Sequence, residues 1–259
     1  MPTLSADSLP RVAPTPKQPV TVNVRTLPRN GHVATHAHPW AQLACTLRGA
    51  VRLRAGHTTW IVPPTRAVWI PPRVEHEVTL IGEVELRTVY VDASAAPRAL
   101  STCDVIDVST LMRELIESLA HVTKKTNPLR YELLSQLLLE ELRTAPTLSL
   151  DLRLPEDRRL RTLCEALLED PGATFGLEEW APKVGASPRT LARLFQQDLG
   201  MTFGQWRQRV RLAHAAALVS IGQPLATVAA ALGYESASAF SAMFKRALGR
   251  SPREFFGGE

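Results

Sequence analysis

The chain has 259 residues, enough for two domains that each bury a core of their own. Its composition is that of a globular protein, and it contains no apolar run long enough to span a membrane. The N-terminus lacks the basic-then-apolar order of a signal peptide, so we expect none. The three cysteines, Cys45, Cys103 and Cys164, fit neither a disulfide framework nor a metal knuckle. These features exclude membrane and disulfide-rich secreted proteins and predict a cytoplasmic protein with reduced thiols.

Residues 1–19 contain five prolines and few apolar residues that could form a core, so we expect a disordered leader. From Val20 onward the sequence changes to short alternating runs separated by glycine and proline. Many short strands at this spacing are typical of an antiparallel barrel or sandwich. The runs cover residues 20–25, 42–47, 51–53, 58–62, 67–70, 77–81 and 84–91.

Helical periodicity begins near Ser109 and continues to about Leu142. The second half, from Leu129, is richer in leucine than contact with one sheet requires. Either this surplus packs against the sheet and a neighbouring helix, or it forms a dimer interface. Residues 144–155 lack clear periodicity and contain two prolines, which is typical of a linker. In the first half of the helical region, before Leu129, the apolar residues form one stripe that consists of Leu111, Leu115, Leu119 and Val122.

The C-terminal part contains two helix-turn-helix patterns. In the second pattern, a short apolar helix stops at Gly233, and the next helix carries Phe240 and Phe244 on one face. In the first, Ser187 is a good N-cap residue and Pro188 suits the first helical position, where its missing N–H costs nothing. We therefore expect helical pairs over about 177–198 and 225–248.

The two patterns also share their spacing. Ala181 and Gly185 of the first pattern recur 48 residues later as Ala229 and Gly233. Gly233-Tyr234-Glu235-Ser236, followed by Phe240, Phe244, Gly249 and Ser251-Pro252, closely resembles the C-terminal signature of the AraC/XylS family of bacterial transcription regulators. The resemblance covers residues 156–256 and implies an all-α DNA-binding domain with two helix-turn-helix units.

The charge of this region supports a nucleic-acid partner. Between Lys183 and Arg253 there are ten basic residues, opposed only by Asp198 and Glu235, whereas residues 156–182 are acidic. Because the basic segment coincides with both candidate recognition helices and the helix between them, we expect it to face phosphate.

The first recognition helix can read bases directly. Its arginines can each bind guanine through two hydrogen bonds, and its glutamine can bind adenine in the same way. The alternative is that the arginines contact only phosphate, as most protein–DNA hydrogen bonds do. The second helix presents small side chains, and we expect it to fix register. The residues expected at the DNA are Arg189, Ala192, Arg193, Gln196, Ala237, Ser238, Ser241, Ala242 and Lys245.

The N-terminal half contains His36-Ala37-His38 with Gln42 four residues on, and later Pro71-Pro72-Arg73 leading to His76. If residues 36–42 are extended, the side chains of His36, His38 and Gln42 share a face. The pattern resembles the two motifs of the cupin family, with two departures: Gln42 replaces the usual glutamate, and Arg73 replaces a glycine.

The resemblance implies a cupin-like barrel that senses a small molecule. Its histidines either hold a divalent first-row transition metal or line a polar pocket. Tryptophans near the motifs are either ligand platforms or core residues. The expected metal ligands are His36, His38, Gln42 and His76, and the expected pocket residues are Trp40, Gln42 and Trp69.

The sequence thus predicts an α+β protein, in which a cupin-like antiparallel β-barrel precedes an all-α double helix-turn-helix domain. We expect a sequence-specific DNA-binding transcription regulator that forms a homodimer, binds a small-molecule effector and, as an activator, contacts RNA polymerase. The expected bounds are 1–19 for the leader, 20–100 for the barrel, 101–143 for a helical dimerisation segment, 144–155 for the linker and 156–259 for the DNA-binding domain.

An alternative is a cupin-type metal-dependent oxygenase or isomerase with an accessory DNA-binding tail. An enzyme has no need of two complete helix-turn-helix units. The barrel also shows no obvious general acid–base pair besides the histidines. We therefore expect a regulator without enzymatic activity.

Overall fold

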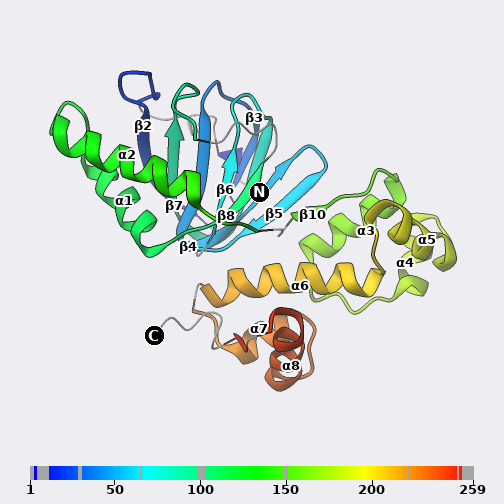
Figure 1. Cartoon of the computed structure of the whole chain (residues 1–259). Coiled ribbons are helices and arrows are strands. Elements are labelled where there is room, and N and C mark those ends of the chain that lie inside the picture. The colour runs from blue at the N-terminus through cyan, green and yellow to red at the C-terminus, as the bar shows by residue number, and fades with distance from the viewer. Residues whose placement is uncertain are drawn as a thin grey trace. The chain divides into compact units, whose positions relative to one another are not determined.

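The computed structural model describes residues 3–4, 12–28, 31–64, 66–97, 103–148, 151–220, 222–249 and 251–252. The chain divides into two compact units, one formed by residues 1–56 and 60–151 and the other by residues 57–59 and 152–259. An antiparallel sheet with two helices makes up most of the first unit, and helices make up most of the second (Figure 1). This is the predicted α+β arrangement, with the sheet preceding the helices.

The strands are β1 Thr3–Leu4, β2 Val20–Leu27, β3 His32–His36, β4 Ala41–Ala55, β5 Thr58–Val62, β6 Arg66–Ile70, β7 His76–Val91, β8 Asp104–Asp107, β9 Thr147–Leu148 and β10 Asp151–Arg153. The helices are α1 Thr110–His121, α2 Pro128–Thr144, α3 Arg158–Glu169, α4 Leu177–Val184, α5 Pro188–Leu199, α6 Phe203–Ser220, α7 Leu225–Ala231 and α8 Ala237–Leu248.

Two long strands, β4 and β7, organise the sheet by pairing with each other in antiparallel fashion. Strand β7 also pairs with β2 and β3, and β4 also pairs with β5 and β6. Beyond β6 the sheet continues through β8 to β9. Strands β3, β4 and β7 carry or flank the histidine motifs, so the centre of the sheet positions the candidate site.

Each long strand was expected as two shorter ones. The runs 42–47 and 51–53 are both parts of β4, and the runs 77–81 and 84–91 are both parts of β7. Gly49 lies where the β4–β7 register shifts, with φ of 73°. A Cβ at this position would lie 2.3 Å from the carbonyl oxygen of Glu83, so only glycine fits. The glycine marks an irregularity within one strand rather than a turn between two.

Helices α1 and α2 lie beside the sheet and share a core with it (Figure 1). Tyr131 of α2 anchors this packing, because its hydroxyl donates to the Val20 carbonyl at 2.9 Å and accepts from the Val20 amide at 3.1 Å. Leu111, expected in the buried stripe of the first helix, is instead 47% exposed. The buried residues of the two helices are Met112, Leu115, Ile116, Leu119, Tyr131, Ser135, Leu138 and Leu142.

The leader and the linker differ from expectation where they are described. Residues 3–4 form β1, which pairs in parallel with β3, and Thr15 and Gln18 form a bridge, whereas residues 1–2 and 5–11 lie outside the described part. The segment 144–155, expected to be a linker, includes the short strands β9 and β10. Strand β8 begins at Asp104, beyond the end at residue 100 that we expected for the sheet.

In the helical unit, the two helix-turn-helix patterns fold as α4–α5 and α7–α8, and α6 connects them (Figure 1). The cap at Ser187 forms as the sequence predicts, with Ser187 Oγ accepting from the Thr190 amide at 3.1 Å, and Ser236 Oγ caps α8 in the same way by accepting from the Ala239 amide at 3.1 Å. Gly185 after α4 is left-handed, with φ of 70°. Within the described part of the chain, none of the helices combines the length and hydropathy needed to cross a membrane.

Helix α6 packs against both patterns. Near its start, Phe203 and Trp206 lie 5.6 Å and 6.3 Å from the buried ring of Phe195 in α5, measured between ring centroids. Farther along, α6 contributes Ala215 to the core of the second pattern. The other buried members of that core are Val228, Ala229, Leu232, Phe240 and Phe244.

Candidate DNA interface and histidine cluster

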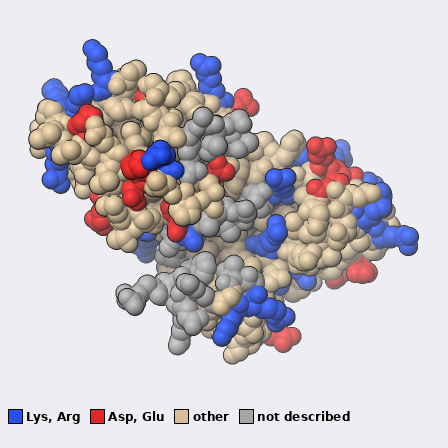
Figure 2. Space-filling model, in the orientation of Figure 1, with Lys and Arg blue, Asp and Glu red and all other residues tan. Residues whose placement is uncertain are grey.

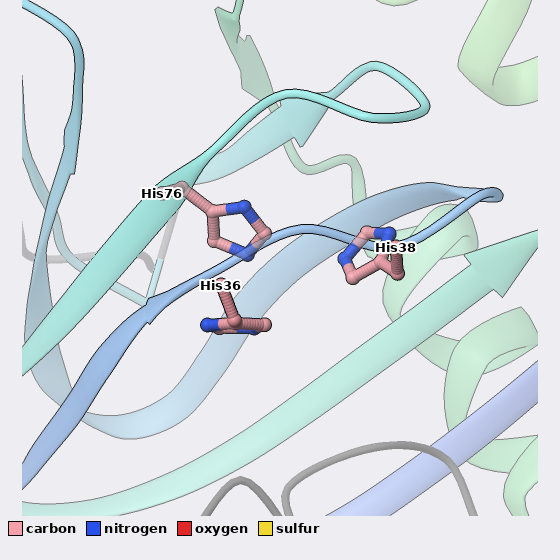
Figure 3. Close-up of side chains that lie close together, drawn as sticks. All are labelled: His36, His38 and His76. Carbon is pink, nitrogen blue, oxygen red and sulfur yellow. The ribbon is translucent and has the colours of Figure 1, made fainter.

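Three histidines come together in the sheet unit, as the sequence predicted. His36 ends β3 opposite His76, which begins β7, and His38 lies in the connection to β4. One ring nitrogen of each lies within 4.8 Å of the others. The ring centroids of His36 and His76 are 4.3 Å apart, and those of His38 and His76 are 5.2 Å apart. Figure 3 shows the three imidazoles gathered at one place between these segments.

The convergence does not arise from a continuous strand. Strand β3 ends at His36, the chain bends at Pro39 and Trp40, and β4 begins one residue before Gln42. Gln42 still reaches His38, because its Oε1 lies 2.8 Å from His38 Nε2. The assumption that residues 36–42 are extended was therefore wrong, although three of the four predicted ligands cluster and the fourth contacts one of them.

All three imidazoles are oriented by backbone carbonyls. Each Nδ1 lies at hydrogen-bonding distance from a carbonyl oxygen, which can only accept, so each Nδ1 carries a hydrogen. Burial lowers the pKa of His38, and it lowers the pKa of His76 to about 4. Both rings are thus neutral near pH 7, with the lone pair on Nε2. The pairs are His36–Ala34 at 2.9 Å, His38–Trp40 at 2.8 Å and His76–Val74 at 2.9 Å.

Arg73 preserves the turn that its position in the motif requires. Among the described residues, it is the one non-glycine residue with positive φ, at 65°. Its amide donates to the His38 carbonyl at 2.7 Å, which ties the loop before His76 to the histidine segment. Arginine adopts here the left-handed conformation that glycine takes more readily, at a cost of about 1–2 kcal/mol.

An aromatic pair borders the cluster. Trp40 stacks on His38 with an interplanar angle of 7° and meets the ring of Tyr90 edge-on at 6.1 Å. Tyr90 pairs directly with Gln42 across β4 and β7. Sequence reasoning missed Tyr90, because its position at the site depends on this long-range register and no local motif marks it.

Trp69 does not reach the cluster. It pairs with Leu43 across β4 and β6, whereas Gln42 pairs with Ile70, so Trp69 and Gln42 point to opposite faces of the sheet. The Trp69 side chain is fully buried in the core beneath α1 and α2. Of the three predicted pocket residues, the structure brings Trp40 and Gln42 to the histidines.

The predicted recognition residues lie on the outer faces of α5 and α8. On α5 the side chains of Leu191, Leu194 and Phe195 are buried, and the four residues expected at the DNA are exposed. The Arg193 guanidinium donates to Gln197 Oε1 at 3.0 Å, which holds it over the helix surface. The exposed residues are Arg189, Ala192, Arg193, Gln196, Ser238, Ala242 and Lys245, and Ala237 and Ser241 are half-buried.

Part of the basic segment has a structural role instead. Arg207 donates to the Phe175 carbonyl at 3.3 Å, and desolvation lowers the pKa of Arg207. Arg211 likewise donates to backbone carbonyls of the helical unit. Arg250 and Arg253 lie outside the described residues. Figure 2 shows the Lys and Arg side chains of the helical unit in separate groups on the face drawn. The backbone contacts of Arg207 and Arg211 give these two of the ten basic residues a role within the fold.

Comparison with known proteins assigns both units. An AraC-like ligand binding domain matches residues 24–142, and a helix-turn-helix domain matches residues 180–257. The HTH-type transcriptional regulator NimR of Escherichia coli (strain K12) is 36% identical over 222 residues, which cover 85% of this chain and 81% of NimR. The Arabinose operon regulatory protein of the same strain is 35% identical over 131 residues, which cover 49% of this chain and 45% of that protein.

Among solved structures, ToxT from Vibrio cholerae with a bound unsaturated fatty acid is similar over 92% of this chain and 95% of that chain. The identity is 11% and the TM-score is 0.37. The match with NimR, by contrast, spans most of both sequences. With a ligand-binding domain followed by a helix-turn-helix DNA-binding domain, the chain belongs to the AraC family of transcription regulators.

Proposed function

We propose that this regulator reads a specific DNA sequence chiefly through α5 and that α8 sets its register. The exposed outer face of α5 carries the proposal, since Arg189, Arg193 and Gln196 are the residue types that discriminate bases in the major groove. The small side chains on the outer face of α8 allow close approach to DNA but discriminate weakly between bases.

Arg193→Ala tests base reading on operator fragments in a gel-shift assay with the full chain. We expect a loss of about 1–3 kcal/mol and relaxed preference at one base step, as for an arginine that binds guanine through two hydrogen bonds. Arg209→Ala is the comparison, because Arg209 is exposed on the connecting helix, and as a phosphate contact it should weaken binding to all sequences alike and leave the base preference unchanged. A uniform loss over all sequences for Arg193→Ala would assign Arg193 to phosphate and contradict the proposal.

We also propose that a small molecule bound in the N-terminal domain controls this DNA binding. The match to an AraC-like ligand binding domain supports an effector, and the buried polar cluster around His38 and Gln42 offers groups that could hold one. The named relatives are transcription regulators, which supports a role without catalysis in the cytoplasm, where the DNA lies. As an activator, the protein would also contact RNA polymerase.

The helix α2 supports a homodimer as the functional state. One face of α2 packs on the sheet, whereas Leu129, Leu133 and Leu137 are 71%, 59% and 44% exposed at successive turns of its other face. Such a stripe is what a second copy of the same helix can cover.

Leu133→Lys in the full chain tests this interface by sedimentation at micromolar concentration. We expect the wild type to be dimeric and the variant to be monomeric. Val24→Lys serves as control, because Val24 is 46% exposed and lies on β2 rather than on α2. A monomeric wild type, or a Leu133→Lys variant that stays dimeric, would contradict the interface.

A further inference from the structure

We propose that Gln197 is a positioning residue for base reading, which orients the Arg193 guanidinium on α5 and thereby sets the preference for guanine at one base step. The inference rests on the proposed function, because it concerns how Arg193 meets a base. It adds a residue that acts on DNA only through its neighbour.

The contact between the two side chains lies on the outer face of α5. Arg193 Nη1 donates to Gln197 Oε1 at 3.0 Å, and both residues are exposed. Side chains four residues apart on a helix are neighbours, and the Cα–Cβ bond of the second one tilts back toward the first. An exposed contact of this kind adds little to helix stability. Its main consequence is therefore the direction that it gives to the arginine.

The chemistry of the guanidinium decides what this contact leaves available. Arginine carries five N–H donors in a rigid planar fork. The bond to Gln197 uses one N–H of Nη1, whereas the edge formed by Nε and Nη2 has no partner among the described residues. Two parallel N–H groups on that edge match the O6 and N7 acceptors of guanine. Gln197 thus occupies a donor that guanine recognition does not need.

A second arginine on the same face makes the direction of Arg193 important. Arg189 precedes Arg193 by four residues, and both are exposed. Like charges at this spacing on a helix repel each other. The bond to Gln197 draws Arg193 toward the C-terminal end of α5, away from Arg189. The two cations are therefore kept apart along the helix, so that each can meet its own group on the duplex.

A neutral acceptor suits this position. The amide oxygen of Gln197 orders the arginine without bringing a negative charge to a surface that meets phosphate. An arginine that is ordered only on binding loses about two- to tenfold in affinity, because its rotamer freedom is then lost at that moment. The loss applies to the guanine contact, which requires the order, and so it lowers the preference for guanine.

The test is a double-mutant cycle in gel-shift titrations of the full chain on two operator duplexes. The duplexes are identical except that the G·C pair whose preference Arg193→Ala relaxes is replaced by A·T. Gln197→Met keeps the length and helix propensity of glutamine but removes the acceptor. We expect it to lower the preference for the G·C duplex about two- to tenfold. In an Arg193→Ala background the same change should have no effect on the preference.

Two further variants separate positioning from direct contact. Gln197→Glu should keep the preference for G·C, since a carboxylate accepts the same bond, but should weaken binding to both duplexes through repulsion of phosphate. Gln196→Met is the matched comparison on the same helix. If Gln196 reads a base itself, this variant should relax preference at another step, and its effect should persist in the Arg193→Ala background.

Two results would overturn the inference, in variants whose thermal midpoints match the wild type. One is a Gln197→Met variant with undiminished preference where Arg193→Ala relaxes it, which would leave the base-reading role of Arg193 intact. The other is a loss of preference that persists in the Arg193→Ala background, which would mean that Gln197 contacts DNA itself. A uniform loss for Arg193→Ala would instead contradict the proposed function, and the positioning role with it.

Discussion

The guanidinium of Arg211 lies over the ring of Tyr234, with Cζ 5.1 Å from the ring centroid. Arg211 belongs to α6, and Tyr234 follows α7. The same guanidinium donates to the carbonyls of Pro171 at 3.0 Å and Ala173 at 3.3 Å, in the loop after α3. One side chain of the connecting helix thus joins the loop that precedes the first helix-turn-helix pair to the second pair.

Arg211→Ala should lower the free energy of unfolding by about 1–3 kcal/mol, because it leaves two partly buried carbonyls without their charged donor. Arg209→Ala, at an exposed position of the same helix, should change it by less than about 0.5 kcal/mol. Urea denaturation of the full chain measures both. Equal stability of the two variants would show that the Arg211 contacts do not hold the unit together.

Gly233→Ala and Gly185→Ala form a matched pair, since the two glycines occupy equivalent turns, with φ of 71° and 70°. Both variants should lose about 1–2 kcal/mol, because alanine is strained in a left-handed conformation. A Cβ on Gly233 would in addition lie 2.5 Å from the Gly172 carbonyl oxygen, whereas one on Gly185 meets nothing within 4 Å. Gly233→Ala should therefore be the less stable variant in thermal unfolding, and the reverse order would contradict this packing.

Arg73→Gly should be more stable than Arg73→Ala by about 1 kcal/mol, since only glycine enters the left-handed region without strain. Because the Arg73 side chain is exposed, replacing it removes little packing, so the difference between the two variants reports on the backbone conformation. The midpoint of thermal unfolding measures the difference. If Arg73→Gly and Arg73→Ala melt together, the positive φ of this turn carries no strain.

The three cysteines should be unreactive in the folded protein. All are buried and free, and burial raises the pKa of Cys45 and of Cys103 to about 12 and that of Cys164 well above its ordinary value. Raising the pKa keeps the thiols protonated at pH 8, and the thiolate is the reactive form. We expect iodoacetamide to modify none of them in native buffer and all three in denaturant, as mass spectrometry would show. Rapid modification of the native protein would contradict this burial.

Local signals were sufficient to predict the helical unit. The serine caps Ser187 and Ser236 and the left-handed glycines Gly185 and Gly233 act within a few residues of themselves, so their positions in the sequence predict helix bounds directly. The roles of Arg207 and Arg211 could not be predicted from the sequence, because composition does not reveal which basic side chains turn inward to bind backbone carbonyls.

The sheet unit was harder to predict, because its site depends on pairing between distant strands. Gly49 predicted a turn but lies within β4, since a glycine at an irregularity and a glycine at a turn look alike in sequence. The positions of Trp69 and Tyr90 follow from cross-strand register, which placed one outside the site and the other inside it. The histidine spacing did predict the cluster, although a bend rather than an extended strand brings His38 to Gln42.

Selection of genomic fragments by the purified full-length protein tests the central claim most directly. We expect a small set of fragments that share one sequence. In shift assays their preference over random duplex should persist as salt rises, while affinity for random DNA falls, because phosphate contacts carry the salt dependence and base contacts carry the specificity. Equal affinity for selected and random duplexes at every salt concentration would contradict the assignment of this protein as a sequence-specific regulator.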